Sequence, residues 1–301
     1  MPYAQSGTAR IYYEVMGDPA APPILFVGGF SAQIIGWQED FCRLIVAKGF
    51  RAIRFDNRDV GLSQMFDGTD GHSPGYTLHD MAEDGFAILD HLGIDRAHIV
   101  GQSMGGMIAQ SMAGSRPERT ISLTLVFTAP YISVEYLPPL AEVPNMTFDR
   151  VDRATFIERI VEEQRLNATD IYPFEEAWVR EFAEISYDRA HAPEGVVRQL
   201  GAMLTDIGQP FTDHTRLTMP VALIHGRDDG RVTAAGSLEL ARLIPHAELH
   251  LYPGMGHFVV QPLWAEFIDI IARTARRGEK TPSASGRADA GRKRDAADAP
   301  V

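Results

Sequence analysis

The sequence predicts an α/β fold, in which a mostly parallel β-sheet carries helices on both of its faces. Short runs of β-branched and aromatic residues alternate with amphipathic helical stretches along the chain of 301 residues. This order of elements is typical of parallel sheets, whose neighbouring strands are joined by crossover helices. Some of the runs, such as ILFV and LTLVF, are apolar throughout, as expected for strands buried on both faces.

The predicted elements follow one another regularly. Strands are expected at residues 10–15, 22–29, 51–56, 97–100, 121–127, 221–226 and 247–253. Helices are expected at residues 38–49, 77–93, 103–115, 237–244 and 262–277. Helix 38–49 ends at Gly49, a residue type that often terminates helices. Helix 77–93 begins at Thr77 and has Asp80 three residues later, the spacing of a capping box.

One long segment has no strand pattern. Between Ala129 and Asp213 the sequence contains helical patterns and loops, and strands are predicted before and after it. We interpret residues 129–213 as a helical cap inserted into a core formed by residues 1–128 and 214–277. The tail, residues 278–301, is small, polar and charged without an apolar period, so we expect it to be disordered.

The composition excludes several classes of partner. The net charge of −12 disfavours nucleic acids and anionic membrane surfaces. No apolar run reaches about 18 residues, so no membrane-spanning helix is expected. The chain has no secretory leader pattern and has 25 Arg against 3 Lys, which favours a bacterial cytoplasmic protein. A homo-oligomer is compatible with the sequence, which does not determine the oligomeric state.

The stretch GQSMG, residues 101–105, lies between a predicted strand and a predicted helix. Gly-x-Ser-x-Gly in this position is typical of a nucleophile elbow, a strained turn that exposes the serine hydroxyl. The alternative is a plain tight turn. Because a serine hydroxyl is a poor nucleophile without a base, the assignment of Ser103 depends on a histidine and a carboxylate elsewhere in the chain.

Both residue types follow later strands. His257 lies in YPGMGHF after the last predicted strand, and HGRDDGRV after strand 221–226 supplies Asp228 and Asp229. A histidine can take the serine proton, and an acid can orient the imidazole. The order serine, acid, histidine is the one expected for this sheet topology.

These motifs carry a resemblance to a known family. From about residue 10 to 275 the chain resembles the α/β-hydrolase superfamily, and within it the bacterial carboxylesterases that include aclacinomycin methylesterase-like enzymes. The resemblance is carried by FVGGFSAQIIGW, RAIRFDNRDVGLS, GQSMGGMIA, HGRDDGRV and PGMGHF. It implies an α/β-hydrolase fold with an eight-stranded sheet. The family pattern Gly-x-x-Asp, counted from Gly226, selects Asp229 as the acid.

The resemblance also implies an oxyanion hole made by two backbone amides, each donor being worth about 3–4 kcal/mol of barrier. One is the N–H of Met104, which follows the nucleophile. The other is the N–H of Phe30 in VGGFSAQ, where relatives often carry His-Gly-x and this chain has Gly28-Gly29-Phe30. The two glycines also suit a simple turn, and both interpretations can hold together.

The substrate pocket is harder to place. Gly29, Trp37 and Trp178 are candidate pocket residues, with a core role equally open for Trp37. Other aromatic or apolar candidates in the cap are Met146, Tyr172, Phe174 and Phe182. Arg58 and Asp59 are interpreted as a structural pair. Residues 135–213 have 16 acidic residues against 7 Arg and no Lys, a balance of −9 that disfavours anionic substrates.

No cofactor and no metal are expected. His225 near Asp228 and Asp229 lacks a second ligand cluster, and we expect it to pack beneath the loop. No Gly-x-Gly-x-x-Gly motif follows the first strand. The single cysteine, Cys42, lies in an amphipathic helix and is expected to be a small packed residue.

The sequence thus predicts a serine carboxylesterase (EC 3.1.1 class) that cleaves small neutral esters through an acyl-enzyme. A cofactor-free perhydrolase of the haloperoxidase type, a lactonase and a C–C bond hydrolase would use the same three residues. A non-catalytic ligand-binding protein on the same scaffold is a further alternative from a different class. Fold and motifs define a reaction class and not a substrate.

Overall fold

The computed structural model describes residues 2–66, 75–138, 148–166, 171–172 and 174–280. Its centre is an eight-stranded sheet with the order β1-β2-β4-β3-β5-β6-β7-β8. The pairs β1–β2 and β2–β4 are antiparallel, and every other pair is parallel. The strands are β1 (Tyr3–Ser6), β2 (Ala9–Met16), β3 (Pro23–Val27), β4 (Arg51–Phe55), β5 (Ala97–Gln102), β6 (Thr120–Val126), β7 (Val221–Gly226) and β8 (Glu248–Tyr252). The predicted mostly parallel α/β sheet is confirmed.

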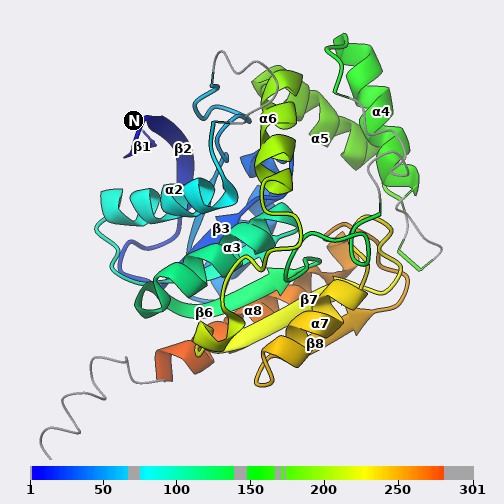
Figure 1. Ribbon diagram of the computed structural model, residues 1–301. Helices are drawn as coiled ribbons and strands as arrows, with labels where there is room; N and C mark the ends of the chain where they lie inside the picture. Colours follow the sequence, from blue (N-terminus) through cyan, green and yellow to red (C-terminus); the bar gives the residue numbers. More distant parts are fainter. Residues whose placement is uncertain (1, 67–74, 139–147, 167–170, 173, 281–301) are drawn as a thin grey trace, which may run out of the picture.

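Helices cover both faces of this sheet (Figure 1). On one face the apolar core includes residues of α2 (Leu78–His91), α3 (Met104–Ser115) and α7 (Ala235–Leu243). On the other it includes residues of α1 (Glu39–Ala47) and α8 (Trp264–Lys280). Strand β3 shows why its apolar run is continuous. Leu25 and Val27 belong to the first core, whereas Ile24 and Phe26 belong to the second. Because successive side chains of a strand point to opposite faces, all four are buried.

The boundaries agree closely with the prediction, with a few differences. The capping box is confirmed, because the Thr77 hydroxyl accepts the Asp80 N–H at 3.2 Å and the Asp80 carboxylate accepts the Thr77 N–H at 2.8 Å. Strand β1 is missing from the prediction because its sequence, YAQS, has little apolar character. Helix α8 continues to Lys280, past the predicted end at residue 277. The expected disorder of the tail concerns mostly residues 281–301, which lie outside the described residues.

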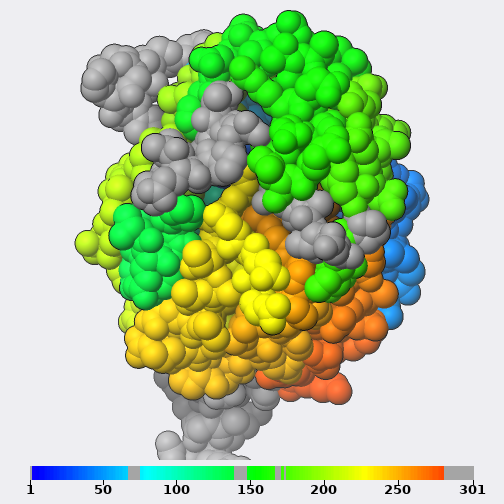
Figure 2. All heavy atoms as spheres, turned by 90° about the vertical axis from the view of Figure 1, so that its right-hand side faces the viewer, coloured from blue at the N-terminus to red at the C-terminus, as the bar shows by residue number. Residues whose placement is uncertain are grey.

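Between β6 and β7 the described residues form the α-helices α4 (Arg153–Leu166), α5 (Glu176–Arg189) and α6 (Pro193–Leu204). No strand occurs among the described residues of this segment. The helices α4 and α5 pack on each other around Ile157, Val161, Val179 and Ala183. In Figure 2 the green surface of this segment lies above the yellow and orange surface of the chain from β7 onward. We refer to α4, α5 and α6 together as the cap helices.

Within the described part of the chain, no helix has both the length and the hydropathy that a membrane crossing requires.

Cys42 is buried in α1, as expected for a packed residue, and burial raises the pKa of its thiol to about 12.

His98 in β5 is a buried titratable group, with 1% of its surface exposed. Its Nδ1 lies 2.9 Å from the Ser122 hydroxyl. The nearest carboxylate oxygen, from Glu279, is 3.8 Å from Nε2, too far for a hydrogen bond. Burial, together with the charge of Arg96, lowers the pKa of His98 to about 4. The folded chain therefore resists protonation here at pH values where the unfolded chain accepts the proton.

We predict that this group makes the protein less stable in mild acid. Between pH 7 and pH 5 the unfolded chain protonates at His98 and the folded chain does not, which lowers the free energy of unfolding by about 2 kcal/mol. His98→Asn retains a hydrogen-bond partner for Ser122 without a titrating ring. Between pH 7 and pH 5, the free energy of unfolding of this variant should therefore fall by about 2 kcal/mol less than that of the wild type. Urea unfolding at the two pH values measures both proteins, and equal losses would contradict the prediction.

Candidate active site

Ser103 occupies the turn between β5 and α3 in an unusual backbone conformation, with φ of 54° and ψ of −124°. Its N–H donates to the Val126 carbonyl at 2.9 Å, and its carbonyl accepts the Thr128 hydroxyl at 2.9 Å. A non-glycine residue at positive φ is strained, so these bonds hold the serine in place. The turn thereby has the geometry of the elbow that its sequence predicts.

The glycines beside Ser103 permit this turn to pack. A Cβ added to Gly105 would lie 2.3 Å from the Val27 carbonyl oxygen, and one added to Gly101 would lie 2.2 Å from the Gly105 carbonyl oxygen. Both contacts are with backbone, which cannot rotate away as a side chain can. The start of α3 therefore approaches the end of β3 more closely than any residue with a side chain would allow.

His257 and Asp229 meet Ser103 from two later loops. The His257 Nε2 lies 2.9 Å from the Ser103 Oγ, and the His257 Nδ1 lies 2.7 Å from the Asp229 Oδ2. Asp229 follows β7, and His257 follows β8. Asp228 points elsewhere, since its carboxylate accepts the Gly254 N–H and is 46% exposed. Of the two aspartates, the structure thus brings Asp229 to the histidine.

The carboxylate of Asp229 is fully buried, and both of its oxygens accept hydrogen bonds. Its second oxygen accepts the N–H groups of Arg231 at 2.8 Å and Val232 at 3.0 Å. Burial by itself would raise the pKa of Asp229. The charge of His257, its hydrogen bond to the carboxylate and the His225 imidazole, whose Nε2 is 3.4 Å from Asp229 Oδ2, outweigh burial and hold that pKa well below its usual range. An ionised carboxylate at this place favours the tautomer of His257 with its proton on Nδ1, which leaves Nε2 free to accept from serine.

His225 supports this loop from below, as predicted. It is completely buried, its Nδ1 lies 2.6 Å from the Ser237 hydroxyl, and its Nε2 lies 2.9 Å from the Val232 carbonyl. On the other side of the site, the Phe127 ring packs against the His257 ring with centroids 4.5 Å apart. Among the described residues, no group of three or more His, Cys, Asp or Glu is arranged to hold a metal ion.

The loop after β3 lies directly beside the serine. A Cβ added to Gly29 would lie 3.3 Å from the Ser103 Cβ, so a side chain here would crowd the hydroxyl. Phe30 follows Gly29 in this loop, and Met104 follows Ser103 at the start of α3. Within the described residues, neither the Phe30 nor the Met104 N–H donates a hydrogen bond to the protein. Both amides are therefore available to an acceptor from outside the chain.

A cavity of about 560 Å³ opens over Ser103 and His257. Its walls are mainly apolar and come from the loops after β3 and β6, from the cap helices α4, α5 and α6, and from the loops around His257. They include Phe30, Ile132, Phe156, Ile160, Phe182, Leu200 and Phe258. This size is in the range of pockets that enclose drug-sized ligands.

The three candidate pocket residues take different positions. Gly29 lines the cavity next to Ser103. Trp37 borders it but is mainly a core residue, because it is 2% exposed and its indole donates to the Val27 carbonyl at 3.1 Å. Trp178 is not among the described residues that line this cavity. It packs behind two that are, Phe182 and Phe258.

The remaining aromatic candidates divide in the same way. Phe182 lines the cavity, whereas Tyr172 and Phe174 do not. Met146 lies outside the described residues.

Arg58 and Asp59 do not pair with each other. Arg58 binds Asp84, at 2.6 and 2.7 Å, and Asp59 binds Arg198 of α6, at 2.6 and 2.9 Å.

Sequence reasoning missed the polar groups within the cavity. The cavity is lined by Arg159 and Glu163 of α4 and by Arg231, which lies in the loop after β7 that carries Asp229. Glu163 pairs with Arg231 at 2.8 Å. Burial raises the pKa of Glu163. The charges of α4 suggest a solvent-exposed face when the helix is considered alone. In the folded chain, part of that face lines the cavity instead.

The close approach at Gly105 leads to a stability prediction. Gly105→Ala must displace the backbone of Val27, so we expect at least 2 kcal/mol of destabilisation, the range of overpacked or strained sites. Gly230→Ala is the matched control, because an added Cβ there meets nothing within 4 Å. Its stability should be unchanged or slightly raised. Thermal and urea unfolding measure both variants, and equal stabilities would contradict the packing argument.

Comparisons with known proteins agree with this geometry. Residues 22–260 match the family model described as the alpha/beta hydrolase fold. Rhodomycin D methylesterase from Streptomyces peucetius is 28% identical over 272 residues, which cover 82% of this chain and 88% of the relative. A non-heme haloperoxidase from Rhodococcus erythropolis is 28% identical over 275 residues, which cover 85% of this chain and 93% of the relative.

Solved structures show the same fold. The enol-lactonase from Burkholderia xenovorans LB400 has a TM-score of 0.72 at 22% identity, covering 91% of this chain and 99% of that one. A 2-hydroxy-6-oxo-6-phenylhexa-2,4-dienoate hydrolase from Rhodococcus sp. strain RHA1 has a TM-score of 0.74 at 23% identity, covering 91% of this chain and 98% of that one. With the family model matching most of its length, the chain belongs to the alpha/beta hydrolase fold family and is similar to rhodomycin D methylesterases.

Proposed function

We propose that the protein is a serine hydrolase that cleaves carboxylic esters through an acyl-enzyme. The observation that carries the proposal is the continuous hydrogen-bonded path from Ser103 through His257 to Asp229, with contacts of 2.9 and 2.7 Å. This path opens into a cavity large enough for a small molecule. The methylesterase relatives support an ester as the substrate.

In the proposed acylation step, the Ser103 Oγ attacks the ester carbonyl carbon while His257 Nε2 accepts the hydroxyl proton. The tetrahedral intermediate then collapses, and His257 gives the proton to the leaving alkoxide, which departs as the alcohol. Asp229 keeps its charge throughout and stabilises the imidazolium. Water, deprotonated by the same imidazole, attacks the acyl-enzyme and releases the acid.

The carbonyl oxygen gains negative charge in both steps. We assign the N–H groups of Phe30 and Met104 as its donors, since they flank Ser103 and make no hydrogen bond to other described residues. The Met104 amide also lies at the N-terminus of α3, where the helix dipole favours negative charge.

The cavity favours esters with a bulky, largely apolar acid portion. Its walls are mainly apolar, and the segment 135–213 has a net charge of −9, which disfavours anionic substrates. Because the relatives include methylesterases, a small alcohol is the leaving group we propose. A perhydrolase, lactonase or C–C bond hydrolase reaction would use the same three residues. The relatives include a non-heme haloperoxidase, a bifunctional esterase/perhydrolase and a 2-hydroxymuconate semialdehyde hydrolase.

Substitution of Ser103 tests its proposed role as the nucleophile. Ser103→Ala should lower kcat/KM for p-nitrophenyl butyrate by at least about 1,000-fold, because the variant has no attacking hydroxyl. A fluorophosphonate probe should label the wild-type protein at Ser103, located by peptide mass spectrometry, and leave the variant unlabelled. Equal slow hydrolysis by both proteins would refute the esterase proposal and favour the non-catalytic alternative.

Substitution of Leu200 tests whether the acid portion of the ester binds in the cavity. Leu200→Trp adds bulk on a cavity-lining position of α6, so kcat/KM should fall at least about tenfold for a naphthoate methyl ester and less than about threefold for methyl acetate. Val197→Trp is the control, since Val197 lies on the same helix, is 39% exposed and does not line the cavity. If the two variants discriminate equally between the esters, the acid portion does not bind in this cavity.

A further inference from the structure

The segment Gly28–Ile34, which we call the oxyanion loop, follows β3 and carries the Phe30 amide. Its backbone is strained one residue beyond Phe30, where Ser31 has φ of 60°. A side chain at positive φ persists only when its surroundings hold it. The question is which groups hold this loop beside Ser103.

The core supplies part of the support. The Asn57 side-chain amide donates to the Gly28 carbonyl at 3.0 Å, and Asp56 accepts the Ile34 N–H at 2.5 Å. These contacts fix the two ends of the loop. Neither reaches its middle, where Phe30 and Ser31 lie.

The middle is held by Gln199 of cap helix α6. Its side-chain oxygen accepts the Ser31 N–H at 3.0 Å, and its side-chain nitrogen donates to the Arg58 carbonyl at 2.7 Å. Gln199 is completely buried, so both bonds form away from water, where an unpaired amide is costly. One turn earlier, Gly195 packs so closely that an added Cβ would lie 2.1 Å from the Asp59 carbonyl oxygen. The helix that carries Gln199 therefore lies firmly against the core.

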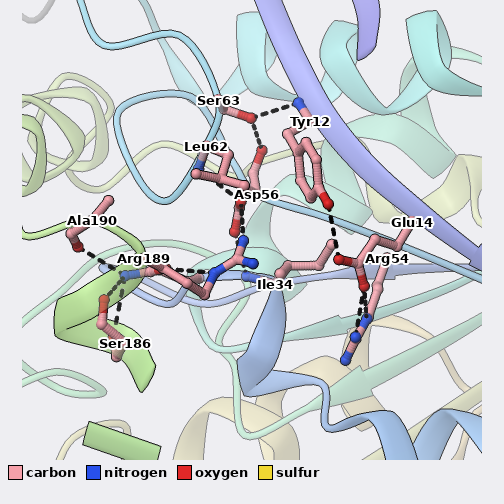
Figure 3. A network of polar contacts seen from close by, with 11 residues as sticks. Tyr12, Glu14, Ile34, Arg54, Asp56, Leu62, Ser63, Ser186, Arg189 and Ala190 are labelled. Carbon is pink, nitrogen blue, oxygen red and sulfur yellow. Dashed lines mark hydrogen bonds and ion pairs between the residues drawn. The ribbon is translucent and has the colours of Figure 1, made fainter. Parts of the chain in front are cut away.

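The far end of the loop is held by cap helix α5. The Gln33 side-chain nitrogen donates to the Ser186 and Ala190 carbonyls, at 2.7 and 2.9 Å, and its oxygen accepts from Arg189 Nε at 3.0 Å. Arg189 also binds the buried Asp56 carboxylate at 2.7 Å. Figure 3 shows Arg189 reaching from α5 to Asp56, which also accepts the N–H groups of Ile34 and Leu62.

We propose that Gln199 is a positioning residue for ester hydrolysis: it holds the Ser31 backbone from the cap and so aims the adjacent Phe30 N–H at the oxyanion. This inference rests on the proposed function. In this arrangement the cap completes the oxyanion hole as well as shaping the cavity. The Gln33–Arg189–Asp56 contacts keep the other side of the loop in register with α5.

The test compares Gln199→Met with Arg198→Lys. Methionine is close in length to glutamine but can neither accept the Ser31 N–H nor donate to Arg58. Arg198→Lys loosens the neighbouring contact between the same helix and Asp59 without touching the oxyanion loop. For p-nitrophenyl butyrate, Gln199→Met should lower kcat about 10- to 100-fold with KM changed less than about threefold, as expected when one oxyanion donor is misaligned. Arg198→Lys should lower Tm and leave kcat unchanged.

A second readout reports the oxyanion directly. A trifluoromethyl ketone forms a tetrahedral adduct with the serine whose charged oxygen occupies the hole. Its inhibition constant should rise in Gln199→Met by about the factor that kcat falls, and stay unchanged in Arg198→Lys. If kcat and Tm fall in parallel in both variants, Gln199 has a folding role only and the inference is overturned.

Gln199→Glu provides a pH signature and a variant closer to the natural side chain. A neutral carboxyl can accept the Ser31 N–H and donate to the Arg58 carbonyl, whereas the ionised carboxylate cannot donate. The kcat of Gln199→Glu should therefore approach wild type at the acidic end of the active range and fall below it as pH rises. A pH profile of kcat parallel to wild type would overturn the inference.

These failures are distinguishable from failure of the proposed function. Activity that persists in Ser103→Ala refutes the esterase proposal itself. A Gln199→Met protein that is folded, labelled at Ser103 by the fluorophosphonate and has the wild-type kcat refutes only the role of Gln199.

Discussion

The contact of Gly105 with the carbonyls of Val27 and Gly28 is the constraint on which the site depends. It brings the start of α3 against the end of β3 with no side chain between them. That approach forces the sharp turn at Ser103 and sets the oxyanion loop beside its hydroxyl. The loops after β7 and β8 then need only reach the same edge of the sheet to bring Asp229 and His257 to the serine.

Buried negative charge lies in the loops after β4 and β7 and on helix α2. Asp56, Asp59, Asp84 and Asp229 are each almost or completely buried. Arg58 neutralises Asp84 within the core, and His257 and His225 lie beside Asp229. The other two carboxylates find their arginines in the cap, Arg189 for Asp56 and Arg198 for Asp59. A buried carboxylate without a partner is costly, so the core and the cap helices depend on each other.

Much of this fold can be predicted from the sequence, because long apolar periods and the motifs at strand ends are local signals. Such signals predict Ser103 and His257 as site residues. The family resemblance, through the pattern Gly-x-x-Asp counted from Gly226, selects Asp229 over Asp228. Strand β1 is missing from the prediction because its four residues, YAQS, show no clear alternation of apolar and polar side chains. It is stabilised by pairing with β2, which is a tertiary effect.

The cap resists prediction for a different reason. Its helices are amphipathic, but a helix alone does not reveal that one polar side chain, Gln199, faces a strained loop rather than solvent. Arg58 and Asp59 show the same limitation. They are adjacent in sequence, yet Asp59 has φ of 68°, and the two side chains bind Asp84 and Arg198 on different helices. Trp178 does not line the cavity itself but contacts two phenylalanine rings that do, Phe182 and Phe258.

The packing of Phe127 on His257 has a consequence for the motion of the imidazole. Phe127 has φ of 36°, an uncommon conformation for a bulky residue, and this turn lays its ring against one face of the histidine. With Asp229 holding Nδ1, the imidazole has lost most of its rotational freedom in the folded protein. In the proposed reaction, proton transfer at Nε2 would then require little rearrangement of heavy atoms. The entropy cost of ordering this imidazole is incurred once, during folding.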